Sequence, residues 1–267
     1  MLLPIGDDKQ GRLTTPFVVY IIIAINVVVF FLQLSDEPRF TLKYSVVPYK
    51  ITHNMPVVPT GKGNPPALSP GYETDPLVAS GLMRVRGTPQ EPSPDFIWLT
   101  ILTSMFMHGG LMHIAGNMLY LWIFGDNVED NFGHGKFLLF YLLCGIAASM
   151  AQIFVDPNST IPSLGASGAI AGVLGAYLIM FPKNRVRNLL FLGFIFTTIE
   201  LPAVVVLGFW IVLQIFSQYT AMASARHASG GVAYMAHIGG FAAGLVLCFL
   251  FRRRQRTSSR DYSDEWR

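Results

Sequence analysis

Residues 163–177 read SLGASGAIAGVLGAY, a run rich in Gly, Ala and Ser that opens a long apolar segment. Ser167 lies inside this run, where a membrane helix would ordinarily carry Leu or Phe. Side chains this small let the backbones of neighbouring membrane helices approach closely. The stretch therefore predicts a tightly packed membrane helix that holds the Ser167 hydroxyl among glycines and alanines.

The whole chain has the composition of a polytopic membrane protein. Of its 267 residues, 52% are hydrophobic and only 13% are charged, and its mean hydropathy is +0.45. An ordinary soluble domain has about 25% charged residues. Cys144 and Cys248 both lie in apolar runs and are interpreted as packing residues, not as a disulfide. We expect the lipid bilayer as a partner and no nucleic acid.

Apolar segments of about 20 residues mark transmembrane helices. The sequence predicts six of them, near residues 16–34, 110–126, 136–154, 164–181, 202–219 and 234–251. The first is also compatible with a signal peptide, but it lacks a small-x-small cleavage site, so an uncleaved helix is favoured. Segment 188–201 is apolar but is interrupted by Glu200 and followed by Pro202. It is interpreted as an interfacial or re-entrant piece, with an extension of the fifth helix as the alternative.

Basic residues indicate the orientation of the six predicted helices. Clusters at residues 9–12, 183–187 and 251–256 fall on one side of the membrane if there are six spans. Because the cytoplasmic side carries the excess of Lys and Arg, both termini are expected to be cytoplasmic. The long loop after the first helix has a centre, residues 55–76, that is rich in Pro and Gly and is expected to be irregular. The predicted regions are a cytoplasmic N-terminus with the first helix (1–34), a long extracytoplasmic loop (35–97), a helical core (98–251) and a basic cytoplasmic tail (252–267).

Polar residues gather near the outer ends of three helices that run in the same direction. His113 and Asn117, Ser167, and His237 each lie within about two turns of the start of their helix, roughly 5–10 Å deep at 1.5 Å per residue. His113 and Asn117 are four residues apart and share one helix face. Polar groups at membrane depth are costly and by default mark a functional site. The matched depth predicts that these four side chains form one site.

The four residue types suit nucleophilic catalysis. A serine hydroxyl needs an adjacent base, commonly His, and the oxyanion that forms needs preorganised donors. His237 would be the base for Ser167. The Ser167 amide, at the start of a helix, would bind the oxyanion together with side-chain N–H groups of Asn117 and His113.

Two glycine pairs explain how the base reaches the nucleophile. Gly168 and Gly172 follow Ser167, and Gly240 and Gly244 follow His237, both with small-xxx-small spacing. Such pairs bring membrane helices close together.

Each residue also has a structural interpretation. A serine in a membrane helix commonly bonds back to a carbonyl, and an intramembrane histidine can serve packing alone. GASGA is not the G-x-S-x-G elbow, because residue 169 is Ala. A metal bound by His108, His113 and His237 would lack both an H-E-x-x-H motif and a neighbouring carboxylate, so no metal and no cofactor are expected.

Three motifs together resemble the rhomboid family of intramembrane serine proteases. They are HGGLMHIAGNMLYLWIFGDNVEDNFGHGKF (residues 108–137), GASGAIAG (165–172) and AHIGGFAAG (236–244), and the likeness extends over nearly all of 98–251. The resemblance implies a six-helix core, cleavage of transmembrane substrates near their outer ends, and a Ser–His dyad without an acidic third member. By motif position Ser167 would be the nucleophile, His237 the base, Asn117 and His113 oxyanion donors, and His108 a structural residue.

The chain departs from some family members at two places. Trp98 is followed by Leu99 where some members have Arg, and Ala171 stands where some have an aromatic residue that stacks on the base. The second departure leaves open what orients His237. The rival function is a catalytically inactive rhomboid-like protein that binds membrane helices; a transporter is disfavoured because paired intramembrane carboxylates are lacking. The expected location is a cell membrane, taken to be a prokaryotic plasma membrane.

Overall fold

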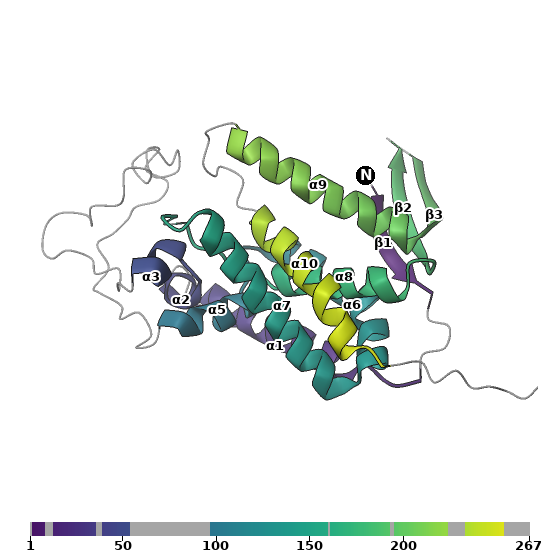
Figure 1. Ribbon diagram of the computed structural model, residues 1–267, viewed down its shortest axis with the longest axis horizontal. Helices are drawn as coiled ribbons and strands as arrows, with labels where there is room; N and C mark the ends of the chain where they lie inside the picture. The colour runs from purple at the N-terminus through teal and green to yellow at the C-terminus, as the bar shows by residue number, and fades with distance from the viewer. Residues whose placement is uncertain are drawn as a thin grey trace, which may run out of the picture.

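The computed structural model describes residues 2–8, 13–35, 39–53, 97–159, 161–192, 195–223 and 233–253. It is mostly helical, with one small sheet at one end of the helix bundle (Figure 1). The Pro- and Gly-rich centre of the first long loop and the end of the basic tail lie outside the described residues. The expectations made for them therefore stay predictions.

Each of the six predicted transmembrane segments is helical. The helices are α1 (Phe17–Ser35), α6 (Leu111–Phe132), α7 (His134–Val155), α8 (Ser167–Met180), α9 (Ala203–Ala223) and α10 (Tyr234–Phe251). Within the described residues, α1, α7, α9 and α10 are long and apolar enough to cross a membrane. Residues Ile97–Phe106 and α6, bent by 79° at their junction, make a fifth candidate if they count as one span.

Helix α8 is short and central. Its 14 residues extend about 21 Å at 1.5 Å per residue, less than the roughly 30 Å of a bilayer core. Every residue from Gly168 to Tyr177 is buried, because α10, α7 and α6 pack around it (Figure 1). A buried helix that is shorter than the membrane places its first residue, Ser167, below the membrane surface if its last residues reach the opposite face.

Most of segment 188–201 forms two paired strands, so the alternative that it extends the fifth helix is wrong, as is the expectation of an all-α fold; its placement at the membrane interface stays a prediction. Strands β2 (Arg185–Leu192) and β3 (Ile195–Pro202) pair antiparallel, and β1 (Leu2–Asp7) pairs with the other edge of β2. Buried and exposed side chains alternate along the start of β2, the period of a strand. Glu200 does not end a helix; it lies across the hairpin 3.6 Å from Arg187. Helix α9 begins only after Pro202.

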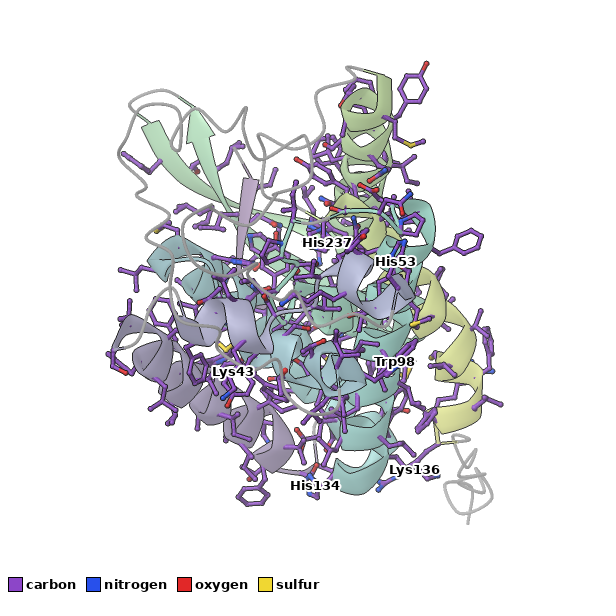
Figure 2. The ribbon with its side chains drawn as sticks, turned by 90° about the vertical axis from the view of Figure 1, so that its left-hand side faces the viewer. Lys43, His53, Trp98, His134, Lys136 and His237 are labelled. Carbon is purple, nitrogen blue, oxygen red and sulfur yellow. The ribbon has the colours of Figure 1, made fainter. Side chains whose placement is uncertain are left out.

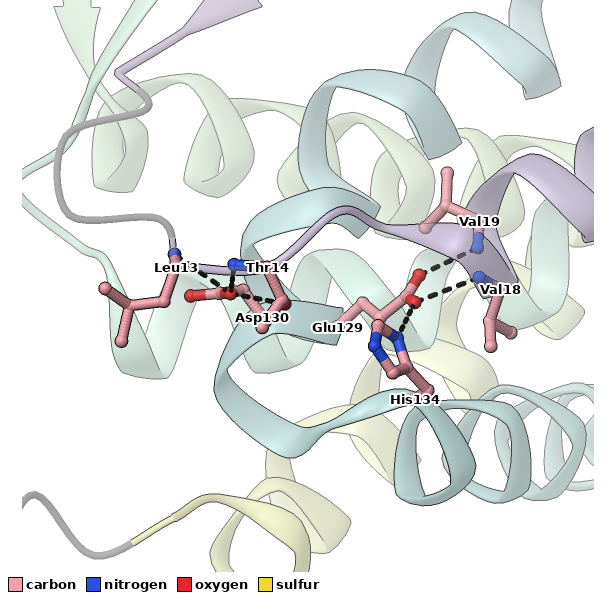
Figure 3. A network of polar contacts seen from close by, with 7 residues as sticks. All are labelled: Leu13, Thr14, Val18, Val19, Glu129, Asp130 and His134. Carbon is pink, nitrogen blue, oxygen red and sulfur yellow. Dashed lines mark hydrogen bonds and ion pairs between the residues drawn. The ribbon is translucent and has the colours of Figure 1, made fainter.

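Two carboxylates at the end of α6 hold the beginning of α1 (Figure 3). The buried Glu129 accepts hydrogen bonds from the backbone N–H groups of Val18 (2.9 Å) and Val19 (2.8 Å) and contacts His134. Asp130 accepts hydrogen bonds from the backbone of residues 13 and 14. The first amides of a helix lack internal partners and favour negative charge, so these carboxylates fix where α1 packs on the bundle.

The chain turns between α6 and α7 at Gly133. Its φ of +85° lies in the region that favours glycine, and its N–H donates to the carbonyl of Glu129 at 2.7 Å. The segment around Gly133 is therefore a tight helix-to-helix connection. It lies well apart from His237, as the labels of His134 and His237 in Figure 2 show.

Short helices and turns support the loop that precedes Ser167. Thr103 donates a hydrogen bond to the carbonyl of Tyr44 (2.7 Å), and Val46 and Ser163 form an antiparallel bridge. The Gly165 N–H donates to the carbonyl of Ser104 at 2.9 Å. These elements are α2 (Arg39–Tyr44), α3 (Pro48–His53), η1 (Ile97–Leu99), α5 (Thr100–Thr103) and η2 (Ser104–Phe106).

Candidate active site

The structure brings Ser167 and His237 into hydrogen-bond contact. Ser167 is the first residue of α8 and His237 the fourth of α10, and their Oγ and Nε2 atoms are 2.8 Å apart. Both helices begin at the same end of the bundle, as the sequence predicts. This distance lies within the range that a general base needs to take a proton from a hydroxyl.

The contact depends on glycines that face each other between α8 and α10. A Cβ atom on Gly240 would lie 2.0 Å from the carbonyl oxygen of Gly168, and one on Gly244 would lie 2.0 Å from that of Gly172. Real Cβ atoms do not approach so closely, so a side chain at either position would push the helices apart. The four glycines singled out in the sequence thus meet in pairs and set the separation of the helices that carry Ser167 and His237.

Two residues of α9 hold the other side of His237. The Gln214 Oε1 lies 2.8 Å from Nδ1 of His237, and the Trp210 ring packs against the imidazole with centroids 5.8 Å apart and planes tilted by 37°. Neither was among the candidate residues, although a glutamine inside an apolar helix is a signal that sequence reasoning can use. Trp210 supplies, from another helix, an aromatic contact with His237 that Ala171 cannot make.

His113 also lies close to Ser167. The Gly109 N–H donates to its Nδ1 (3.2 Å), so in the neutral ring the proton is on Nε2. A Cβ on Gly165 would lie 3.0 Å from this Nε2 and 3.7 Å from the Oγ of Ser167. Gly165, with φ of +129°, therefore leaves room for the Nε2–H of His113 beside Ser167.

Asn117 is buried one turn further along α6. Its amide donates one hydrogen bond, at 3.0 Å, to the carbonyl of His113. A carboxamide has two donor hydrogens, so a second N–H is available for a ligand. The structure thus places Asn117 beside His113 but not in a hydrogen bond with Ser167 itself.

The N-terminus of α8 adds backbone donors. Ala166 caps this helix without a side-chain hydrogen bond. The first amides of a helix have no internal partner and carry the positive end of its dipole. The Ser167 N–H is among them.

His108 packs next to His113 and not next to Ser167. It is 2% exposed, its ring meets the His113 ring edge-on at 5.1 Å, and its backbone N–H donates to Gln33 of α1 at 2.8 Å. His108 thus contacts both the His113 ring and α1, and its structural role stays a prediction.

A small cavity of about 20 Å³ opens beside Ser167. By the same measure a single water molecule needs about 10–15 Å³, so the space is narrow. Small side chains dominate its lining, which is formed by Ser104, Met105, Gly145, Ala148, Ser149, Ser163, Leu164, Gly165, Ser167, Gly168, Ala169, Ala233 and Ala236.

Comparison with known proteins identifies a family match. Residues 95–254, more than half of the chain, match the Rhomboid domain. The chain is 44% identical over 112 residues to the rhomboid protease GluP of Bacillus subtilis (42% of this chain, 21% of that protein). It is 31% identical over 152 residues to the mitochondrial Rhomboid protein 1 of Saccharomyces cerevisiae (55% and 40%). It is 26% identical over 162 residues to the chloroplastic Rhomboid-like protein 11 of Arabidopsis thaliana (58% and 53%). The chain thus spans between a fifth and about half of the length of these relatives.

Proposed function

This chain belongs to the rhomboid family, and on that premise we propose that it is an intramembrane serine endopeptidase that cleaves transmembrane proteins near their outer ends. The observation that carries the proposal is the 2.8 Å contact between Ser167 and His237. The name of the Bacillus relative, a rhomboid protease, supports it. We further propose six membrane spans, cytoplasmic termini and, as the location, a prokaryotic plasma membrane.

The first half of the proposed reaction uses the dyad. His237 Nε2 takes the proton of Ser167 as Oγ attacks the scissile carbonyl. The charge that develops on the carbonyl oxygen is stabilised by the Ser167 N–H, the His113 Nε2–H and the free amide hydrogen of Asn117. His237 then gives its proton to the leaving amine, and an acyl-enzyme remains.

The second half consumes water, which attacks the acyl-enzyme as His237 again acts as base. Because Ser167 lies at the outer end of a helix shorter than the bilayer core, water has to reach it from the outer side. The dyad is therefore expected to work in a hydrated depression within the membrane.

The experiment that tests the proposal is cleavage of a single-span test substrate by the purified protein in lipid vesicles. We expect a discrete product from the unaltered protein and none from Ser167→Ala, which loses one oxygen atom at a packed site and keeps its fold. Absence of cleavage by the unaltered protein across a panel of single-span substrates, with specific capture of those substrates, would instead support an inactive helix-binding protein.

The oxyanion role of Asn117 predicts a moderate loss of rate. Removing one oxyanion donor costs about 10²–10³ in rate in other proteases. Because the His113 ring and the Ser167 amide share the charge here, Asn117→Ala is expected to lower kcat on the order of ten-fold, with KM nearly unchanged. Steady-state kinetics in vesicles measures both constants. An unchanged kcat would remove Asn117 from this role.

The narrow cavity predicts a small side chain at the substrate position just before the scissile bond. Gly168, Ala148 and Ala236 line it, so Ala, Gly or Ser fits and Phe does not. Changing that residue from Ala to Phe should nearly stop cleavage, whereas the same change placed four residues away in the substrate should not. Equal cleavage of the Ala and Phe substrates would contradict the assignment of the cavity.

The same account predicts where the bond lies. In a membrane helix every backbone amide is bonded internally, and the carbonyls are shielded from attack while the segment stays helical. Inserting Gly or Pro near the outer end of a poor substrate should therefore improve its cleavage, as mass spectrometry of the products can measure. Preferred cleavage at the cytoplasmic end would contradict the proposed topology.

A further inference from the structure

The base of the dyad has a polar partner from a helix that carries neither member of the dyad. Gln214 lies on α9, and its Oε1 is 2.8 Å from Nδ1 of His237, whose Nε2 contacts Ser167. Ser167, His237 and Gln214 thus form a continuous chain across α8, α10 and α9. Trp210, one helical turn before Gln214, covers the imidazole from the same helix.

The position of the imidazole proton decides whether His237 can act as a base. A neutral ring carries one proton, and the nitrogen that bears it donates while the other accepts. If the proton sits on Nε2, that nitrogen faces Ser167 as a donor and has no lone pair to take the hydroxyl proton. A carbonyl oxygen at Nδ1 accepts a hydrogen bond and so draws the ring proton to Nδ1.

We propose that Gln214 is a positioning residue that holds His237 in the Nδ1-protonated tautomer and so keeps its Nε2 free to activate Ser167. The role rests on the proposed protease function. In Ser–His–Asp enzymes a buried carboxylate does this work, and its replacement by an amide that imposes the wrong tautomer lowers kcat about 10⁴-fold. Gln214 selects the tautomer with a neutral amide, so a membrane site avoids the cost of burying another charge.

The neighbouring glutamine of α9 shows that the pairing is specific. Gln218 lies one turn beyond Gln214 and is similarly half-buried, yet its side chain makes no hydrogen bond within the part of the chain that the structure describes. Gln218→Leu is therefore a matched control for Gln214→Leu, because the same polar group is removed from the same helix without removing the contact with His237.

The position of α9 has a consequence for the base. Among the four long apolar helices, α9 has the smallest buried share, and it runs along one side of the bundle (Figure 1). Both contacts that orient the base depend on it. Because Gln214 and Trp210 both come from α9, the orientation of His237 depends on how α9 packs against α10.

Kinetics of three variants make the first test. Gln214→Leu removes the acceptor and is expected to lower kcat roughly 10–100-fold, with KM changed less than about two-fold. Gln214→Glu keeps an oxygen at the same reach and should restore kcat to within a few-fold of the unaltered protein, which simple packing would not require. Gln218→Leu should match the unaltered protein. Equal kcat for Gln214→Leu and Gln218→Leu, or failure of Glu to rescue, would overturn the proposal.

The tautomer itself makes the second test, and it needs no proteolysis. In Ser167→Ala protein with ¹⁵N-labelled histidine, the His237 ring signals are assigned by their loss in Ser167→Ala/His237→Ala. We expect the proton on Nδ1 in Ser167→Ala and at least half of the Nε2-protonated form after adding Gln214→Leu. Either of two results would overturn the proposal: a His237 ring protonated on Nε2 while Gln214 is present, or a tautomer that is unchanged by Gln214→Leu. Absence of cleavage by the unaltered protein would instead overturn only the proposed function.

Discussion

Proteolysis is expected to fall to background when Gly240 is replaced by leucine, although Gly240 takes no part in the chemistry. Its Cβ would lie 2.0 Å from the Gly168 carbonyl oxygen, so the larger side chain has to separate α10 from α8. Misplacing reacting groups by about 1 Å can cost about 10²-fold in rate, and a leucine at this position imposes at least that shift. Initial rates of substrate cleavage in vesicles measure the effect.

The control for this variant is Gly208→Leu in α9. A Cβ on Gly208 would meet no atom within 4 Å, so the same substitution in another membrane helix should leave the rate within about two-fold, the small change expected of a side chain in open space. A thermal unfolding scan of both variants separates a local shift of the helices from a loss of fold. Full activity of Gly240→Leu would contradict the account of the glycine-rich stretch around Ser167.

Removing the imidazole of His237 is expected to lower the rate by at least about 10³-fold, since an unassisted serine hydroxyl is a poor nucleophile. In a protease whose catalytic groups act as a unit, loss of one member costs almost as much as loss of all. The double variant Ser167→Ala/His237→Ala should therefore be no slower than either single variant. Rates from long incubations, with Ser167→Ala as background, measure this.

His53→Ala is the matched control for His237→Ala. His53 is an exposed histidine on α3 that stacks on Tyr49 (Figure 2), and its removal should leave the rate unchanged. Substantial cleavage by His237→Ala would exclude a Ser–His dyad.

The helices were predictable from sequence because long apolar runs in this chain have few alternatives to a membrane helix. The meeting of Ser167 and His237 followed from the direction and depth of their helices, and the close contact of those helices followed from the spacing of the two glycine pairs. The candidate site residues could thus be named from the sequence before the structure was known. Their catalytic roles rest on the proposals made above.

The β-hairpin was missed because an apolar count does not separate a strand pair from a membrane segment. The pairing of β2 with β3, which also brings Glu200 next to the arginines of β2, is a tertiary arrangement that an apolar count does not reveal. Strand β1 was missed for a related reason, because it pairs with residues about 180 positions away in the sequence.

Gln214 and Trp210 were missed because an apolar helix does not reveal which of its faces turns inward. Most residues of α9 are apolar on all sides, so its rotation about its own axis is set by packing against α10 and α8. Only the structure shows that one face, with residues 210 and 214, meets His237.

The central claim is that His237 activates Ser167 as a nucleophile, and covalent labelling tests it most directly. The purified protein in vesicles is treated with a fluorophosphonate probe, and the modified residue is identified by peptide mass spectrometry over time. We expect slow labelling at Ser167 alone, no labelling of Ser167→Ala, and labelling of His237→Ala slowed at least about 10²-fold, the lower end of what general-base catalysis contributes. Labelling of Ser167 at an equal rate in the unaltered protein and in His237→Ala, or labelling of a different serine, would contradict the account.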